Sequence, residues 1–273
     1  MLSINSNHSA MSSSIAAKKA STGIDNAIEK LSSGSRINFA KDDAAGQAIA
    51  TRLSAEIMGL EQASRNASYV VKGVAIADSA LQEVASLILR SRELSVAAAN
   101  GTYSDLDREA LNAELSQLVE EIVTIGNNTK FAGIKFFEDK IVSFQIGPDS
   151  GNVFTVDAQH FSTVGLSQAG FFQGNILNET SAQLNMAAMD SALSVVSSFR
   201  SNLASTSNRM EYLISNLDSV KSNLSIAQGR IQDADFAKET GNLANSQILQ
   251  QAATAMIAQA NINKASVLYL LET

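Results

Sequence analysis

The sequence predicts a mainly α-helical protein, an elongated antiparallel helical bundle or coiled coil with a small β-hairpin region in the middle of the chain. One proline in 273 residues leaves almost nothing in the chain that forbids a helix. Apolar residues recur at alternating spacings of three and four in both halves, which is typical of a buried helical seam. An aromatic share of 5% suits closely packed helices better than a wide core.

The N-terminal half carries two helical stripes separated by a loop. Ile24, Ile28 and Leu31 lie on one helical face, and a cluster of small residues then ends that helix. Residues 35–43 are predicted to form a loop, and helix resumes over 44–60. The clearest stripe of this half follows at Val74, Ala77, Leu81, Val84 and Ile88.

A turn separates this stripe from the next helix. Asn100-Gly101 is a pair that can end a helix, and Ser104 followed by Asp107 is typical of a helix N-terminus. The carboxylates that follow Ser104 suit the positive end of the helix dipole. The helix itself is predicted by a stripe at Leu111, Leu115, Leu118, Ile122 and Ile125.

The middle of the chain changes character. Residues 141–146 alternate partly with period two, residues 147–151 form a turn cluster around the proline, and residues 153–157 read as a return strand. These features predict a β-hairpin. The phenylalanines gathered between 131 and 172 favour a small core over a sugar-stacking platform.

The C-terminal half returns to helix. Its heptad pattern predicts one helix over 184–231, roughly 70 Å long at about 1.5 Å per residue. Residues 242–271 contain one charge, Lys264, and place Ile248 and Ile262 on one face with Ala252 and Ala255. A long helix so poor in charge is expected to meet other helices, from its own chain or from neighbours. The heptad seam runs through Met210, Leu213, Leu217, Val220, Leu224, Ala227 and Ile231.

Composition excludes several classes of function. The absence of cysteine removes disulfide scaffolds, thiolate metal sites and thiol nucleophiles, and two distant histidines leave little for a metal site or a triad. A net charge of −7 argues against nucleic-acid binding. Neither a membrane-spanning segment nor a secretory signal of the usual kind is apparent. Asp42 and Asp43 are interpreted as charges at a helix N-terminus, so no catalytic, metal or cofactor site is predicted.

Five short stretches of the sequence are informative as motifs and not only through the spacing of their apolar residues. They closely resemble the N- and C-terminal signatures of bacterial flagellin, in the right order and at the right ends, with Ser35 as one departure from the usual apolar residue. The resemblance covers roughly 1–140 and 180–273. The stretches are Leu31-Ser32-Ser33-Gly34-Ser35-Arg36-Ile37-Asn38, residues 41–50, residues 230–237, residues 247–252, and Ala258-Gln259-Ala260-Asn261.

The resemblance implies a structural, non-enzymatic subunit of the extracellular flagellar filament, exported unfolded and polymerising through its terminal helices. The implied partners are other copies, an export chaperone, the type III export apparatus, the filament cap, hook-junction proteins and the innate Toll-like receptor for flagellin. Nucleic acid and membrane insertion are not implied, and neither is a cofactor. The implied domains are residues 1–40 with 235–273 as the inner filament core, 41–140 with 180–234 as a helical rod, and 141–179 as a short region replacing the variable outer domains.

Two sets of site residues follow from the resemblance. The segment around Arg90 and Leu94 is similar to the family segment for subunit contact and receptor recognition, and Glu114 is grouped with it. The alternative is that Arg90 lies on a solvated helix face and Leu94 serves only in packing. The polymerisation core is expected at Ile24, Ile28, Leu31, Ile248, Leu249, Ala252, Ile262 and Leu268.

Two other functions remain open at this point. A hook–filament junction protein is similar to flagellin at both termini, although full agreement through Ala258-Gln259-Ala260-Asn261 favours flagellin. A surface adhesin or glycan receptor on the same scaffold is the alternative from another class, with its site expected in residues 141–172.

Overall fold

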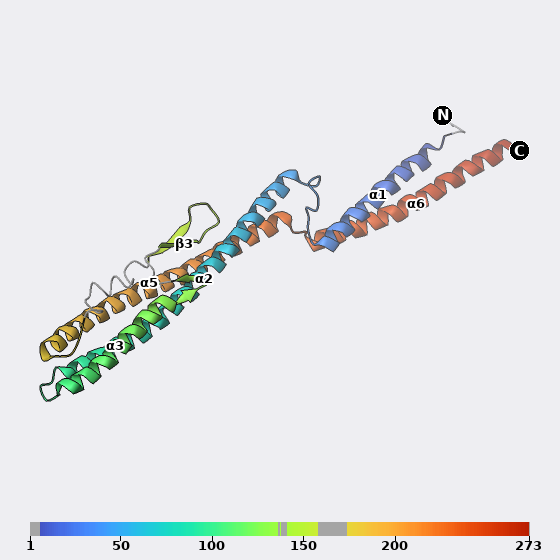
Figure 1. Cartoon of the computed structure of the whole chain (residues 1–273). Helices are drawn as coiled ribbons and strands as arrows, with labels where there is room; N and C mark the ends of the chain where they lie inside the picture. The colour runs from blue at the N-terminus through green and yellow to red at the C-terminus, as the bar shows by residue number, and fades with distance from the viewer. Residues whose placement is uncertain (1–5, 136, 138–140, 158–173, 273) are drawn as a thin grey trace. The chain divides into compact units, whose positions relative to one another are not determined.

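The computed structural model describes residues 6–135, 137, 141–157 and 174–272, and for 141–142, 156–157 and 267–272 it describes the backbone alone. The expected hairpin region therefore lies only partly within the described residues. Figure 1 shows the helices and strands along the chain. The elements are α1 (His8–Ser33), α2 (Ala44–Ala98), α3 (Asp105–Asn128), β1 (Lys130–Phe131), β2 (Ile134–Lys135), β3 (Ile141–Gln145), β4 (Val153–Asp157), α5 (Glu179–Gln232) and α6 (Phe236–Glu272).

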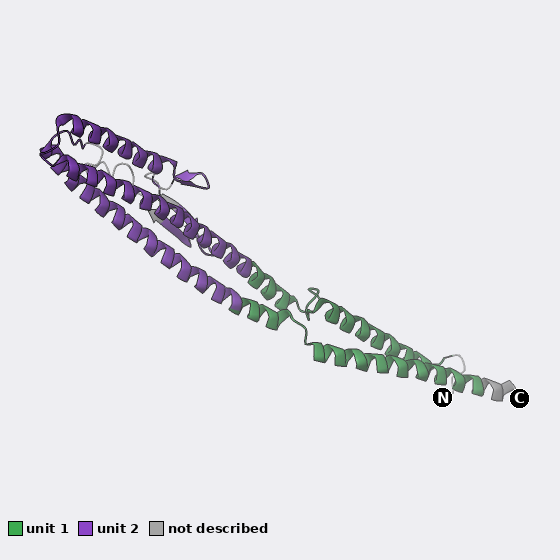
Figure 2. Cartoon of the chain, turned by 90° about the horizontal axis from the view of Figure 1, so that it is seen from below, with its two compact units in different colours: residues 1–55, 223–273 green, residues 56–222 purple. Residues whose placement is uncertain are grey.

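The chain divides into two compact units, coloured separately in Figure 2. Residues 1–55 and 223–273 form the first, here called the terminal unit. Residues 56–222 form the second, here called the bundle unit. The expected mainly helical fold with long antiparallel helices and a small β region is confirmed. None of the helices in the described part of the chain is both long and apolar enough to span a membrane.

The core of the bundle unit is a seam between α2 and α5. All five residues of the stripe predicted on α2 are buried, with at most 3% of their surface exposed. The buried residues facing them from α5 recur at the same heptad spacings, so the two helices interlock along matching seams. On α5 these residues are Met189, Ala192, Val196, Phe199, Leu203 and Met210.

The predicted breaks between helices are confirmed, and two segments described separately in the sequence form one helix. Gly34 ends α1 in the left-handed conformation, with φ of 71°, a geometry that glycine adopts without a steric penalty. Ser104 and Asp107 form a reciprocal capping box at the start of α3. The stretch 44–60 and the stripe that follows it are parts of one continuous helix of 55 residues, α2.

The hairpin predicted in the middle of the chain is confirmed. Strands β3 and β4 pair antiparallel, with Ser143 opposite Thr155 and Phe144 opposite Phe154. A second, shorter hairpin, β1–β2, was not predicted. Its two turn residues, Ala132 and Gly133, both have positive φ, 51° and 82°, as a tight two-residue hairpin turn requires.

The terminal unit contains α1 and α6, which run side by side in both views (Figures 1 and 2). The segments leading into and out of this pair are bonded to each other. The Arg36 N–H donates to the Gln232 carbonyl at 2.6 Å, and the Ala234 N–H donates to the Gly34 carbonyl at 2.9 Å. The Arg36 guanidinium also donates to the Ile231 carbonyl at 2.7 Å. The α1–α2 connection and the α5–α6 connection are thus joined to each other by hydrogen bonds.

Candidate interaction surfaces

The seam between α1 and α6 consists of small and polar residues. Buried and half-buried positions on α6 recur at strict spacings of three and four, as in a coiled coil, but few of them are large and apolar. On α1 the matching positions are mostly alanines. Gly23 lies so close to α6 that an added Cβ would be 2.8 Å from the Ser246 Oγ. The helices therefore approach closely and bury little apolar surface. The α6 positions are Glu239, Leu243, Ser246, Gln250, Ala253, Ile257, Ala260 and Lys264.

The apolar face predicted on α6 exists, but it points away from α1. Ile248 is 64% exposed and Ile262 is 57% exposed, and Ala252 and Ala255 are exposed beside them. Helices of the same chain, one of the two expected partners, do not cover this face within the described residues. Sequence reasoning found only Ile24 and Leu31 of the α1·α6 seam, because most of its other residues are too small or polar to stand out as a stripe.

The other expected polymerisation-core residues divide between seam and surface. Ile24 and Leu31 are half-buried on the seam side of α1, whereas Ile28 is 50% exposed. Leu249 lies beside the outward face of α6 and is 54% exposed. Leu268 belongs to α6, but its side chain lies outside the described residues.

An ion pair crosses the seam of the terminal unit. The Lys30 Nζ lies 3.8 Å from the Glu239 Oε1, and the Asn242 side chain donates to the other Glu239 oxygen at 3.0 Å. Glu239 is 9% exposed, so its carboxylate depends on these partners for compensation of its lost hydration. Near the other end of the pair, the Asn7 side chain donates to the Ala260 carbonyl at 3.1 Å.

Arg90 and Glu114, two residues of the expected contact segment, form an ion pair. The Arg90 guanidinium donates to the Glu114 Oε1 at 2.9 Å and to the Glu93 Oε2 at 2.8 Å, which joins α2 to α3. The hydrogen bond to Glu93 is the main cause of a raised pKa of Arg90, and the hydrogen bond to Glu114 is the second cause. The cluster is exposed and carries two carboxylates for one guanidinium, so it presents a net negative charge.

Leu94 does not belong to that exposed surface. Its side chain is 3% exposed and packs in a small cluster with Ala98, Leu115, Ile176 and Ala182. The expectation that Leu94 touches a subunit or a receptor directly is corrected, because a buried side chain has no surface to offer. The alternative interpretation, in which Leu94 serves in packing, describes its place in the structure.

Asp43 acts as a cap, as expected for a helix N-terminus, and so does Asp235, whereas Asp42 bonds within the loop that precedes α2. The Asp43 Oδ1 accepts from the Gly46 N–H at 2.8 Å at the start of α2. The Asp235 Oδ1 accepts from the Ala237 N–H at 2.9 Å at the start of α6. Asp42 accepts from the Phe39 and Asn38 N–H groups, and the bond from Phe39 is the main cause of its lowered pKa.

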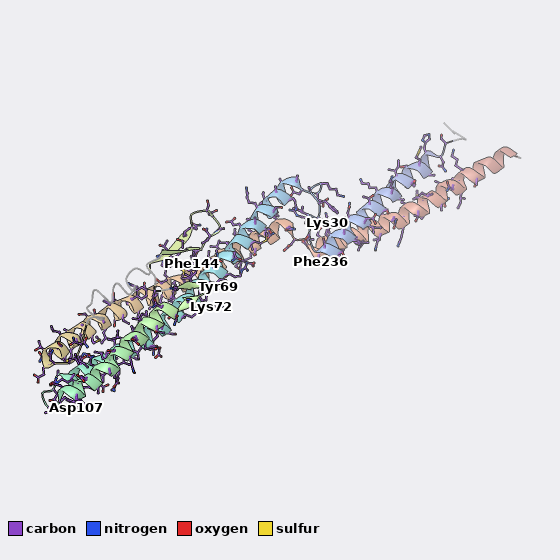
Figure 3. The ribbon with its side chains drawn as sticks, viewed as in Figure 1. Lys30, Tyr69, Lys72, Asp107, Phe144 and Phe236 are labelled. Carbon is purple, nitrogen blue, oxygen red and sulfur yellow. The ribbon has the colours of Figure 1, made fainter. Side chains whose placement is uncertain are left out.

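A groove of about 700 Å³ lies on the bundle unit between α2 and the two hairpins, and sequence reasoning did not find it. Its walls are largely apolar, and the only sequence signal nearby was the concentration of phenylalanines. Figure 3 shows Tyr69, Lys72 and Phe144 in this region of the bundle unit. The lining residues are Asn66, Tyr69, Phe131, Ala132, Ile134, Ser143, Phe144 and Gln145.

Together these surfaces define a structural, self-associating helical protein. Among the described residues, no group of three or more histidine or acidic side chains is placed to hold a metal ion. Several large apolar side chains of the terminal unit are exposed on helices whose shared seam is mostly small and polar.

Comparison with known proteins identifies the family. The bacterial flagellin N-terminal helical region matches residues 4–141, and the bacterial flagellin C-terminal helical region matches residues 186–271. The chain belongs to the bacterial flagellin family. It is a structural subunit of the flagellar filament, located outside the cell, and the family is not enzymatic.

Individual relatives agree with this assignment. The chain is 43% identical to the flagellin of Halalkalibacterium halodurans, with 90% of each chain covered. It is 36% identical to Flagellin FlaB1 of Treponema pallidum, over 98% of this chain and 99% of that protein. The crystal structure of Bacillus cereus flagellin has a TM-score of 0.51 at 27% identity, covering 60% of this chain and 94% of that one. A putative flagellar hook-associated protein from Vibrio parahaemolyticus shares the fold at 13% identity, with a TM-score of 0.59 over 70% of this chain and 100% of that one.

Proposed function

We propose that the chain polymerises by burying the outward apolar faces of α1 and α6 between copies. One observation carries this proposal: the seam of the terminal unit is mostly small and polar, with few large apolar residues, while several large apolar side chains of α1 and α6 are exposed. Ile15 is 66% exposed, Ile248 is 64% exposed and Met256 is 60% exposed. Large apolar side chains exposed in such number on one helix pair suit an interaction site.

The small seam of the α1·α6 pair also suits export in an unfolded state, which the resemblance implies. A helix pair that buries mostly alanine, serine and glutamine gains little free energy against the conformational entropy lost on folding. The pair would be ordered by neighbours in the filament and opened at low cost before assembly. An export chaperone, the type III apparatus, the filament cap and the hook-junction proteins are the partners that fit this cycle.

The experiment places charge on the outward face without touching the seam. Ile248→Asp combined with Met256→Asp should abolish filaments in seeded assembly followed by negative-stain electron microscopy, because filament formation would bury two unpaired charges. The matched control is Tyr212→Asp on α5, where the side chain is 79% exposed. Long filaments from the α6 double variant would contradict the proposal, provided that its helical content by circular dichroism equals that of the unmodified protein.

The cluster of Arg90, Glu93 and Glu114 is proposed as a second contact between copies. It is exposed, joined by ion pairs across α2 and α3, and negatively charged as a whole. Recognition by the innate Toll-like receptor for flagellin is proposed for the same cluster, on the strength of the resemblance alone. Glu114→Ala should weaken assembly and receptor signalling to different extents if both contacts exist, and a variant that changes neither would remove both proposals.

A further inference from the structure

All the sulfur of the chain belongs to methionine, because the sequence has seven methionines and no cysteine. The surroundings of these methionines differ sharply. Met189 and Met210 are fully buried in the core of the bundle unit, whereas Met11 of α1 is 57% exposed and Met256 of α6 is 60% exposed. Oxidation of a thioether requires access of the oxidant to the sulfur. A peroxide therefore reaches Met11 and Met256 in the folded chain far more readily than the two core methionines.

Met11 and Met256 lie at the same level of the α1·α6 pair. Figure 1 shows that the two helices are antiparallel, with the start of α1 beside the end of α6. The Asn7 side chain donates to the Ala260 carbonyl at 3.1 Å, which fixes one level of the pair. Met11 is four residues after Asn7, and Met256 is four residues before Ala260. Each methionine therefore stands about one helical turn, roughly 6 Å, along the pair from that hydrogen bond.

Both methionines stand among exposed apolar residues of the terminal unit. Ile15 is 66% exposed one turn after Met11, and the exposed Ala252 lies one turn before Met256. Residues 242–263 of α6 carry no charge, so the surroundings of Met256 on this helix are neutral. A thioether suits burial against such residues because it is apolar and flexible. A sulfoxide in the same place is polar and chiral, and it disrupts interfaces that contain methionine.

We propose that Met11 and Met256 are oxidation sites through which a peroxide prevents polymerisation. A sulfur lone pair attacks one oxygen of hydrogen peroxide, so that an S–O bond forms and the O–O bond breaks. The proton of the transferred oxygen passes to the departing oxygen, which leaves as water, so the sulfur is oxidised and the peroxide is reduced. The sulfoxide then places a polar oxygen on a surface that polymerisation would bury, at the cost of its hydration. This inference rests on the proposed polymerisation and adds a means of regulating it.

Peptide mapping by mass spectrometry, after mild treatment of the unassembled protein with hydrogen peroxide, tests which methionines react. Met11 and Met256 should gain an oxygen atom well before Met189 and Met210 do. Met58 of the bundle unit is 60% exposed, so it should be oxidised as well, and it supplies the matched control for effects on assembly. Equal rates of oxidation at exposed and buried methionines would overturn the inference, because burial would then not select the sites.

Seeded assembly measures the consequence of the oxidation. The oxidised protein should show a critical concentration raised about tenfold. Met11→Leu combined with Met256→Leu keeps the apolar volume and removes both thioethers, so this double variant should assemble equally well before and after peroxide. Met58→Leu is the matched control and should stay sensitive to peroxide. Methionine sulfoxide reductases should return the oxidised unmodified protein to its original critical concentration, a measurement that needs no substitution.

The failure of this inference and the failure of the proposed polymerisation are distinguishable. If the untreated protein forms no filaments, the proposed polymerisation itself fails. If it forms filaments and the oxidised protein assembles at the same critical concentration, the oxidation sites do not control assembly and this inference is wrong.

Three further results would also overturn the inference. They are inhibition by peroxide that persists in the double leucine variant, inhibition that the reductases do not reverse, and a loss of helix in the circular dichroism of the oxidised monomer. The last would mean that oxidation unfolds the chain instead of changing its surface. If the double leucine variant fails to assemble even when untreated, the decision falls to the reductases and to Met58→Leu, because insensitivity of the latter to peroxide would assign the effect to Met58.

Discussion

The Asn185 side chain of α5 donates a hydrogen bond of 2.9 Å to the Ser95 hydroxyl of α2, inside the bundle unit where both residues are buried. The Ser95 hydroxyl in turn donates to the Ser91 carbonyl at 2.8 Å. A buried hydrogen bond between two side chains of an otherwise apolar seam forms in only one alignment of the two helices. It therefore helps to set their register, as buried polar residues do in coiled coils.

Ser95→Ala tests this bond. The substitution removes the acceptor of the Asn185 amide and leaves a buried donor unpaired, so the free energy of unfolding should fall by about 1–3 kcal/mol. Ser86→Ala is the matched control, because Ser86 lies on the same helix, bonds to its own backbone four residues back and is exposed. Denaturant unfolding of both variants gives the comparison. An equal effect of the two substitutions would show that the Asn185 bond contributes nothing.

Gly174 is expected to be intolerant of a side chain. A Cβ at this position would run into the Asn185 amide oxygen, and that amide is oriented by its hydrogen bond to Ser95. Gly174→Ala should therefore destabilise the bundle unit by about 1–3 kcal/mol in thermal unfolding. Gly126→Ala in α3 is the control, because a Cβ there meets nothing within 4 Å, and alanine should stabilise the helix slightly. A neutral Gly174→Ala variant would mean that the segment can shift away from Asn185.

Leu217→Asp should destabilise α5 strongly. Leu217 is 7% exposed on the predicted seam, so an aspartate there would bury an unpaired charge at a cost of more than about 2 kcal/mol. Tyr212→Asp on the same helix, at 79% exposure, should change stability little. Circular dichroism melting curves distinguish the two variants, and coincident curves would refute the seam at this level of the helix.

The capping box of α3 predicts a pH-dependent contribution to stability. The Ser104 hydroxyl donates to the Asp107 carboxylate at 2.7 Å and the Ser104 N–H donates at 3.0 Å, and these bonds lower the pKa of Asp107 below its ordinary value. A lowered folded-state pKa gives stability that is present above the unfolded pKa and lost as the pH falls through the folded one. Asp107→Asn should therefore lower the melting temperature at neutral pH, by an amount that shrinks below about pH 5.

Ser104 supplies the control for that measurement. In a Ser104→Ala background the side-chain bond to Asp107 is missing, so the pH-dependent part of the Asp107→Asn effect should diminish. An effect of Asp107→Asn that is the same at every pH, with or without Ser104, would assign the residue a role other than the cap.

Local sequence features predicted much of the bundle unit because each of its signals is short-range. The stripe from Val74 to Ile88 is fully buried, and Ser104 and Asp107 cap α3 as their spacing indicated. The β3–β4 hairpin follows from alternation and a proline-containing turn. The β1–β2 hairpin was missed because strands of two residues are too short to show a period, and Ala132-Gly133 is a weak turn signal.

Spacing and capping within a few residues were enough to establish which residues form helices, which of them share a face, and where most helices start and stop. What covers each face became clear from the packed structure alone. Packing turned Ile248 and Ile262 outward, buried Leu94, and set Tyr69 and Ile134 into one groove although 65 residues separate them. The physical reason is that periodicity fixes the direction of a side chain around the helix axis, whereas its burial depends on the partner that packs there. On α6 the partner helix packs against a face that includes alanine, serine, glutamine and charged residues and has few large apolar ones.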